Sequence, residues 1–138
     1  MGEPCRYDAK AVLCPEVGAY LEGRTAIPVC PEQFGGLSTP RTPAERQPNG
    51  RVVNADGVDV TEAFETGAAF VVALACELGC DQAILKDKSP SCGVHAVYDG
   101  TFSGKLVVGK GITAEALEAA RITVVSENDI KRSVPPCE

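Results

Sequence analysis

Two cysteines lie in loops whose composition suits chemistry better than packing. Cys30 stands in the stretch PVCPEQFGG and Cys92 in SPSCG, so prolines and glycines lie near both thiols, and serines also flank Cys92. A structural cysteine is usually buried among apolar neighbours. Proline fixes the local backbone, and glycine leaves room for a bulky group to approach. The sequence therefore offers two candidate reactive or metal-binding thiols, with two unrelated loop cysteines as the alternative.

The other cysteines and the single histidine give weaker signals. We interpret Cys76 and Cys80 as structural, because they fall within and just after a predicted helix. Cys5 is ambiguous, since the adjacent arginine could stabilise a thiolate. His95 follows Cys92 by three residues, but the chain has no Cys-x-x-Cys pair. A zinc site therefore has little support, and we interpret His95 as a hydrogen-bonded or exposed side chain.

Composition narrows the class of protein. The chain has 138 residues, of which 44% are hydrophobic and 23% charged, as in a globular protein of one domain. Its net charge of -6 argues against a broad nucleic-acid surface and favours a small-molecule substrate. The longest apolar run, AAFVVALAC, is too short to cross a membrane, and the N-terminus has no signal-peptide pattern. We therefore expect a cytoplasmic protein that does not bind membranes.

Two predicted strands lead into the cysteine loops. TAIPVC, at 25–30, predicts a buried strand that ends at Cys30, and QAILK, at 82–86, predicts one that leads to Cys92. Residues 31–50 predict a long loop, because they contain four prolines and three glycines. The other predicted elements are a helix at 14–23, a hairpin at 51–60 turning at Gly57, a helix at 62–79 capped by Thr61, strands at 105–108 and 122–126, a helix at 113–120, and a final turn capped by Ser126. In the helix at 62–79, we expect Gly79 to end the helix and five residues to share one apolar face: Phe64, Ala68, Val71, Ala75 and Leu78.

This alternation of strands and helices predicts an α/β fold. We expect residues 1–138 to form one domain, a three-layer sandwich with a mostly parallel, Rossmann-like sheet. Ligand sites in such folds lie beyond the carboxyl ends of the strands. Both cysteine loops begin at such ends, so we expect them to meet at one edge of the sheet.

Several longer motifs resemble a known family. The stretches CRYD, IPVCPEQFGGLSTPRTPAE, DVTEAF, AILKDKSPSCG, YDGTFSGKLVVGKGIT and VVSENDI together closely resemble the bacterial thiouracil desulfidase family, also known as domain of unknown function 523. The resemblance covers nearly the whole chain. It implies a protein that holds a 4Fe-4S cluster on three cysteines and removes sulfur from thiolated uracil without net redox change.

The resemblance also implies roles for individual residues. Cys30 and Cys92 correspond to the second and third cluster cysteines, and thiolates are the soft ligands that such clusters require. A cluster held by three cysteines has one open iron, which we expect to act as a Lewis acid in hydrolysis of the C–S bond. Glu32 is the candidate base for the attacking water. Ser91, and more weakly Ser89, could bond the substrate or pass a proton.

Alternative roles for these polar residues stay open. Glu32 could be a solvated loop carboxylate, and Ser91 a hydroxyl that caps the backbone. Asp99 is expected to shape the YDG turn through its side chain. We interpret three other polar residues near the loops as ordinary surface charge: Lys86, Arg41 and Glu45.

The N-terminus departs from the family pattern. Family members normally begin with an apolar strand and a SACLLG turn, whose cysteine supplies the first cluster ligand. This chain begins at MGEPCRYD, so we expect that strand and that cysteine to be absent. Cys5 is the nearby thiol that could take the place of the missing ligand. Loss of a central strand would leave its neighbours with unpaired backbone groups.

The sequence thus supports several hypotheses. The leading one is an iron-sulfur-dependent desulfidase acting on thiouracil, a thiolated pyrimidine, or a related small thiolated compound. The alternatives are a non-catalytic iron-sulfur or metal-binding module, such as a sensor or sulfur carrier, and an inactive, truncated family member. A thiol enzyme with Cys92 as nucleophile is a further possibility. The oligomeric state is not predicted.

Overall fold

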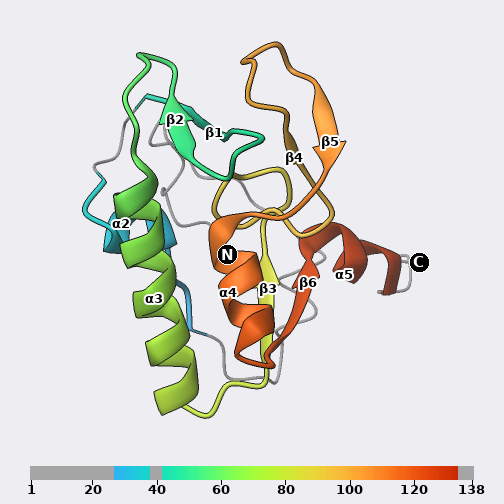
Figure 1. The fold of residues 1–138 in the computed structure, drawn as a ribbon. Coiled ribbons are helices and arrows are strands. Elements are labelled where there is room, and N and C mark those ends of the chain that lie inside the picture. Colours follow the sequence, from blue (N-terminus) through green and yellow to red (C-terminus); the bar gives the residue numbers. More distant parts are fainter. Residues whose placement is uncertain (1–26, 38–41, 134–138) are drawn as a thin grey trace.

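A computed structural model describes residues 27–37 and 42–133 of the chain, shown in Figure 1. These ranges contain four helices and three separate pairs of strands, which together form a mixed α/β fold. The α/β class expected from the sequence is therefore confirmed. The predicted helix at 14–23, Cys5 and Arg41 all lie outside the described residues.

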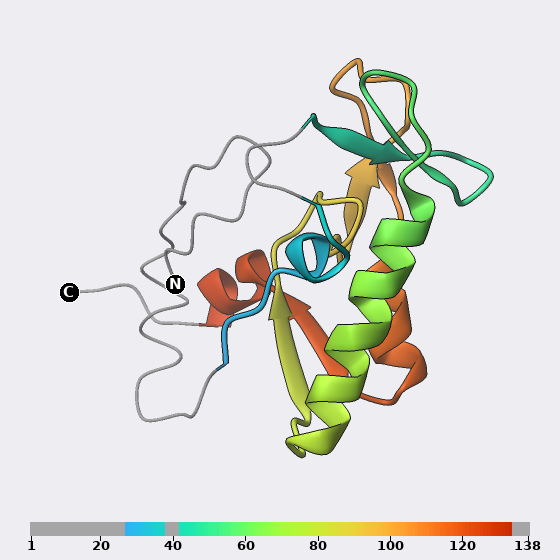
Figure 2. The same cartoon turned by 90° about the vertical axis from the view of Figure 1, so that its left-hand side faces the viewer.

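One pair of strands is parallel and lies beneath two helices. β3 (Gln82–Leu85) pairs with β6 (Thr123–Ser126), with Gln82 opposite Thr123 and Leu85 opposite Ser126. Helices α3 (Thr61–Glu77) and α4 (Ile112–Ala119) lie side by side on one face of this pair (Figures 1 and 2). The chain then ends its described part in α5 (Glu127–Ser133). The predicted strands at 82–86 and 122–126 and the predicted helix at 113–120 are thus confirmed.

The core lies between these helices and the parallel pair. Its main cluster takes side chains from α3, β3, α4 and the segments that follow β3 and α4: Val71, Leu85, Val94, Ala114, Leu117 and Ile122. The predicted apolar face of α3 is buried at Phe64, Ala68 and Val71, which fall on one side of a helix. The prediction is wrong at the last turn, where Leu78 is 52% exposed. Gly79 follows with a positive φ of 69°, a conformation suited to ending a helix.

The other two pairs of strands are antiparallel hairpins. β1 (Ala44–Arg46) pairs with β2 (Val52–Asn54), and β4 (Ala96–Tyr98) pairs with β5 (Leu106–Val108). Both hairpins lie beyond the carboxyl end of β3 (Figure 1). The two hairpins are joined by the side chain of Glu45 in β1. It accepts hydrogen bonds from the backbone N–H groups of Gly100 and Phe102, at 3.0 and 3.2 Å. The YDGTFSG stretch is therefore a turn anchored to the neighbouring hairpin.

Some expectations about the sheet and the first loop are wrong or not shown. The described strands do not form the single, mostly parallel, Rossmann-like sheet of a three-layer sandwich, since only the β3–β6 pair among them is parallel. Residues 27–30 are described but are not in a strand, and Pro28 has no backbone N–H to give to one. The expected loop at 31–50 contains α2 (Pro31–Phe34) as well as β1. Pro31 suits the first position of a helix, since it needs no N–H partner there.

Hairpin and cap predictions were correct in part. Gly57 turns the chain with a φ of 81°, and Val53 forms a bridge with Asp59 across that turn. Thr61 does not cap α3 as predicted, because its hydroxyl accepts the backbone N–H of Val52 at 2.8 Å. Ser126 does cap α5, with its hydroxyl oxygen 3.2 Å from the backbone nitrogen of Asp129. No helix of the described ranges is long and apolar enough to cross a membrane.

Candidate metal centre and active site

The two cysteine loops lie at the same end of the parallel pair. Cys30 is the N-cap residue of α2, and Cys92 lies in the segment 87–95 that follows β3, here called the Cys92 loop. Both α2 and this loop lie at the level of the carboxyl end of β3 (Figure 2). Val29, next to Cys30, packs against the same core cluster as Cys92. Both cysteines are partly buried.

Two glycines allow α2 to lie against α3. A Cβ atom at Gly67 of α3 would come within 1.9 Å of the carbonyl oxygen of Pro31. A Cβ atom at Gly35, which follows α2, would come equally close to the carbonyl oxygen of Ala63. Only glycine permits these approaches. The close contact of the two backbones fixes the start of α2, and with it Cys30.

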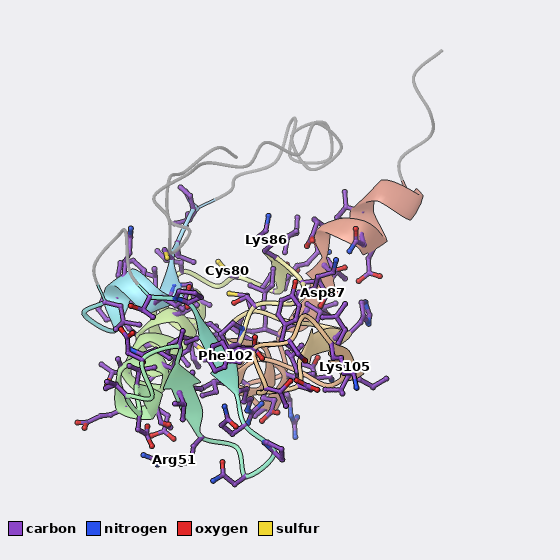
Figure 3. All side chains as sticks on the ribbon, turned by 90° about the horizontal axis from the view of Figure 1, so that it is seen from above. Arg51, Cys80, Lys86, Asp87, Phe102 and Lys105 are labelled. Atoms are coloured by element: carbon purple, nitrogen blue, oxygen red, sulfur yellow. The ribbon has the colours of Figure 1, made fainter. Side chains whose placement is uncertain are left out.

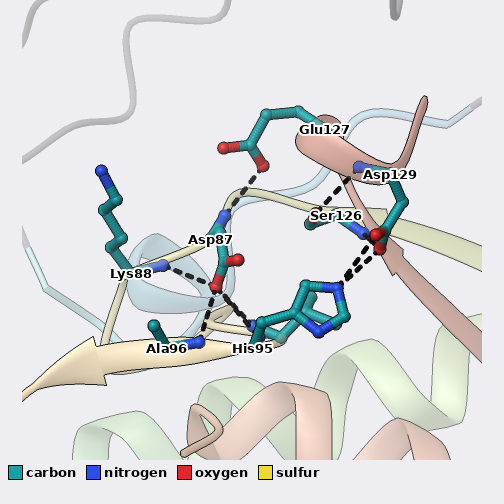
Figure 4. Close-up of polar contacts among 8 residues, drawn as sticks. Asp87, Lys88, His95, Ala96, Ser126, Glu127 and Asp129 are labelled. Carbon is teal, nitrogen blue, oxygen red and sulfur yellow. Dashed lines mark hydrogen bonds and ion pairs between the residues drawn. The ribbon is translucent and has the colours of Figure 1, made fainter. Parts of the chain in front are cut away.

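The carboxylate of Asp87 organises the backbone of the Cys92 loop. Its Oδ1 atom accepts hydrogen bonds from four backbone N–H groups, those of Lys88 at 2.9 Å, Val94 at 2.9 Å, His95 at 3.1 Å and Ala96 at 3.2 Å (Figure 4). The two ends of the SPSCG stretch therefore converge on one oxygen atom. Asp87 was not among the predicted site residues, although an aspartate directly after the predicted strand at 82–86 is a signal that could have found it.

The surroundings of Asp87 act on its pKa in opposite directions. Burial raises the pKa of the carboxyl, which belongs to a residue only 9% exposed. The backbone hydrogen bonds stabilise the ionised form and outweigh burial, so the pKa of Asp87 lies below its usual value of 3.8. The carboxylate therefore stays charged at neutral pH.

Helix α5 holds the Cys92 loop from its other side. Glu127 accepts the backbone N–H of Asp87 at 2.8 Å, and Nε2 of His95 lies 2.8 Å from Oδ2 of Asp129 (Figure 4). The same Asp129 oxygen accepts the N–H of Ser126 at 2.9 Å. His95 is thus a hydrogen-bonded and exposed side chain, as expected from the sequence. The first turn of α5 ties down both ends of the loop.

Ser89 and the start of α4 fix the backbone around Cys92 itself. The hydroxyl oxygen of Ser89 accepts the N–H groups of Ser91 and Cys92, both at 3.1 Å. The first N–H groups of α4, at residues 111–114, donate to carbonyl oxygens of Pro90, Ser91 and Gly93 at 2.8 to 3.3 Å. These groups have no partner within a helix, so the loop supplies the cap that α4 otherwise lacks.

The two predicted catalytic side chains lie in different settings. Ser91 is only 1% exposed, and its hydroxyl oxygen lies 2.7 Å from that of Thr113 in α4. Glu32 is partly buried in the first turn of α2, two residues after Cys30. Both side chains therefore belong to elements that also carry a candidate ligand. Thr113 was missed from the sequence, although the GKGIT stretch that contains it is part of the family motif.

Other predicted roles had mixed outcomes. Asp99 does shape its turn, because it accepts the N–H and the hydroxyl of Thr101, at 2.9 and 2.6 Å. Glu45 is not simple surface charge, since it anchors that same turn. Lys86 is exposed as expected, whereas its neighbour Asp87 is buried beside α5 (Figure 3). Two cysteines interpreted as structural, Cys76 and Cys80, are exposed, so burial does not explain them.

The donor set fits part of an iron-sulfur site. Within residues 27–37 and 42–133, no group of three or more His, Cys, Asp or Glu side chains is arranged to hold a metal ion. Cys30 and Cys92 are nevertheless two partly buried candidate ligands at the same end of β3 (Figure 2), and thiolates are what iron-sulfur clusters require. A cluster would therefore need a further ligand from outside the described residues.

Comparison with known proteins identifies the family of this chain. The sequence matches the 2-thiouracil desulfurase family over residues 1–129, and the chain belongs to that family. It is 40% identical to the uncharacterized protein YbbK of Bacillus subtilis (strain 168), across 94% of this chain and 91% of that protein. The resemblance drawn from the sequence motifs is thus confirmed.

The structure is similar to a solved enzyme. It matches the 4Fe-4S-dependent thiouracil desulfidase TudS (DUF523Vcz) with a TM-score of 0.86 and 41% sequence identity. The match covers 95% of this chain and 87% of TudS.

Proposed function

We propose that the chain is an iron-sulfur-dependent desulfidase that removes sulfur from thiouracil or a related small thiolated compound. The observation that carries this proposal is the placement of the Cys30 and Cys92 loops at the same end of β3 (Figure 2), against one core cluster, in a member of the 2-thiouracil desulfurase family. The similarity to TudS, whose name states its dependence on a 4Fe-4S cluster, supports the choice of cofactor. The reaction is a hydrolysis, in which the thiocarbonyl and water give the carbonyl and hydrogen sulfide.

Three cysteines would hold the cluster. Cys30 and Cys92 are the two ligands in the described residues, and Cys5 is the proposed third. A bound cluster with one open iron supplies a Lewis acid for the thiocarbonyl sulfur. The chain holds each described cysteine by backbone contacts, Cys30 through the packing of α2 on α3 and Cys92 through Ser89.

Glu32 is the proposed general base. A water that attacks the thiocarbonyl carbon must lose a proton, and a positioned carboxylate can take it. Glu32 is partly buried and lies one helical turn or less from Cys30, on an element fixed by two glycine contacts. This setting supports a directed role rather than that of a freely solvated carboxylate.

Ser91 is the proposed second catalytic group. Its hydroxyl bonds the substrate or passes a proton, while Thr113 fixes its orientation from a distance of 2.7 Å. What supports this use is the position of Ser91 directly before Cys92, in the loop that carries the proposed ligand. We further propose that the chain works as one domain in the cytoplasm, where its cysteines stay reduced.

A non-catalytic metal-binding module is the second candidate. It would use the same two partly buried cysteines as the enzyme. Such a module would need Cys30 and Cys92 but not Glu32. The role of Glu32 therefore separates the two functions.

Turnover of 2-thiouracil tests the proposal. The chain is reconstituted anaerobically with iron and sulfide, and uracil and released sulfide are measured over time. We expect turnover by the wild type and a loss of about 100-fold in Glu32→Gln, with bound iron unchanged. Glu62→Gln is the matched control, since Glu62 is an exposed acid in the first turn of α3.

Three outcomes would contradict the proposal. Bound iron without turnover would indicate a non-catalytic module. Turnover by iron-free protein would indicate a thiol enzyme. Equal turnover by Glu32→Gln and Glu62→Gln would exclude Glu32 as the base.

A further inference from the structure

The Cys92 loop is closed by a single carboxylate rather than by regular secondary structure. Lys88, the second residue of the Cys92 loop, has a positive φ of 74°. Residues 89–93, which follow it, contain no strand or helix. The N–H groups on either side of this stretch, at Lys88 and at residues 94–96, donate to one oxygen of Asp87. The shape of the SPSCG stretch therefore depends on this oxygen.

The position and charge of the carboxylate suit this task. Asp87 is buried, and its backbone N–H donates to Glu127 at 2.8 Å. The backbone that carries the Asp87 side chain is therefore held in place. Hydrogen bonds to an ionised acceptor are roughly twice as strong as neutral ones. An amide carbonyl at this position would have two lone pairs and no charge with which to bind four N–H groups. Asparagine therefore keeps the shape of the Asp87 side chain but not its capacity to bind four N–H groups.

We propose that Asp87 is a positioning residue for Cys92, and that its carboxylate holds the Cys92 loop in the shape that presents the Cys92 thiolate to a metal. This inference rests on the proposed function, because it takes Cys92 to be a cluster ligand. It assigns Asp87 no contact with substrate or cluster. It predicts that loss of the carboxylate loosens the loop around Cys92 while leaving Cys30 in place.

Thiol alkylation of the iron-free protein tests the inference without any cluster. Wild type, Asp87→Asn and Asp99→Asn are treated with iodoacetamide, and the rate at each cysteine is followed by peptide mass spectrometry. Asp99→Asn is the matched control, because Asp99 also accepts a backbone N–H but lies in the turn between β4 and β5. We expect alkylation of Cys92 to be about tenfold faster in Asp87→Asn, with Cys30 and Cys76 unchanged. Asp99→Asn should alter none of the three rates.

Several results would overturn the inference. An unchanged rate at Cys92 in folded Asp87→Asn would do so. An equal increase at Cys30 would do so as well, because it would indicate general destabilisation. The same increase at Cys92 in Asp99→Asn would show that the effect is not specific to Asp87.

Reconstitution separates this inference from the proposed function. If Cys92 is a ligand, Asp87→Asn should bind less than half the iron of the wild type, whereas Asp99→Asn should bind the same amount. A wild type that binds no iron would contradict the proposed function, but the alkylation rates would still decide the role of Asp87. A wild type that binds iron and an Asp87→Asn variant that binds the same amount would overturn the positioning role.

Hydrogen exchange of the wild type provides a test if Asp87→Asn does not fold. We expect the amides of Val94, His95 and Ala96 to exchange at least about tenfold more slowly than in an unstructured peptide, because each donates to Asp87. Exchange at the rate of unprotected amides would show that the carboxylate does not hold the loop. The inference would then be overturned.

Discussion

Gly111 touches the backbone of Ser91 so closely that no other residue fits. A Cβ atom at Gly111 would lie 2.3 Å from the carbonyl carbon and from the carbonyl oxygen of Ser91. Gly111 immediately precedes α4, and its own N–H donates to Gly93 at 2.8 Å. The helix start and the Cys92 loop are therefore built against each other. A substitution at Gly111 should therefore shift the backbone at Cys92, although the two residues are far apart in the sequence.

We expect Gly111→Ala to lower the free energy of unfolding by about 1 to 3 kcal/mol, as overpacking does when backbone must move. It should also reduce iron binding, because the backbone that moves is next to Cys92. Urea unfolding and iron content measure the two effects. Gly104→Asn is the control, since Gly104 has open space around it and asparagine tolerates its positive φ. A stable Gly111→Ala variant with full iron content would refute this prediction.

Gly67→Ala should displace Cys30. Alanine in place of glycine normally stabilises a helix by about 1 kcal/mol. Here its Cβ would meet the carbonyl oxygen of Pro31 at 1.9 Å, so we expect a loss of about 1 to 3 kcal/mol and weaker iron binding through displacement of Cys30. Thr66→Ala, at an exposed position of the same helix, should stay within about 0.5 kcal/mol of the wild type. Stabilisation by Gly67→Ala, measured in urea, would be the contrary result.

Ser91 and Thr113 should differ in their effects, although their hydroxyls form one hydrogen bond. Ser91→Ala is expected to keep its iron and to lose thiouracil turnover by about 100-fold, as removal of a catalytic group does. Thr113→Val should cost about 1 to 3 kcal/mol of stability, because it leaves the buried hydroxyl of Ser91 without that partner. Turnover and urea unfolding of both variants provide the test. Full turnover in Ser91→Ala would leave Ser91 with a structural role alone.

Asp59 makes the start of α3 sensitive to acid. Hydrogen bonds from Arg51 and Thr61 lower the pKa of its carboxyl from 3.8 to about 2. A folded-state pKa below the unfolded value gives stability that is present above about pH 4 and is lost as the pH falls through about 2. We therefore expect Asp59→Asn to be less stable than the wild type at pH 6, with the difference shrinking towards pH 2. Urea unfolding across this range checks the trend.

The exposed Asp81 provides a control for this pH dependence. Asp81→Asn should follow the wild type at every pH. A stability difference between Asp59→Asn and the wild type that stayed constant from pH 6 to pH 2 would contradict the assignment of the effect to the Asp59 carboxylate.

Local patterns in the sequence predicted much of the scaffold. The apolar spacing of α3, the short apolar runs of β3 and β6, and the glycine that ends α3 each act through neighbours in the chain. Such features can be read without knowing the fold. The family motifs marked the two loops that carry Cys30 and Cys92.

Features set by contacts distant in sequence were not predictable in this way. The helix at Pro31–Phe34 lies in a stretch rich in proline and glycine, and it packs on α3 through Gly67. The partners of Asp87 and the contact between Gly111 and Ser91 likewise join separate segments. Local propensity favoured a loop at 31–50, and tertiary packing overrode it. The expectation of one mostly parallel sheet was wrong in part because of residues 105–108, a run typical of a buried strand. In the structure, β5 in this run is exposed and pairs with β4 in an antiparallel hairpin.

Iron and sulfide content after anaerobic reconstitution tests the central claim most directly, with wild type, Cys92→Ser and Cys76→Ser compared side by side. Cys76 is the matched control, because it is an exposed thiol of α3 with no proposed role. We predict about four irons per chain in the wild type and in Cys76→Ser, and well under one in folded Cys92→Ser, as expected for a 4Fe-4S cluster that loses a thiolate ligand. Equal iron in Cys92→Ser and Cys76→Ser, or a folded wild type without iron, would contradict the account.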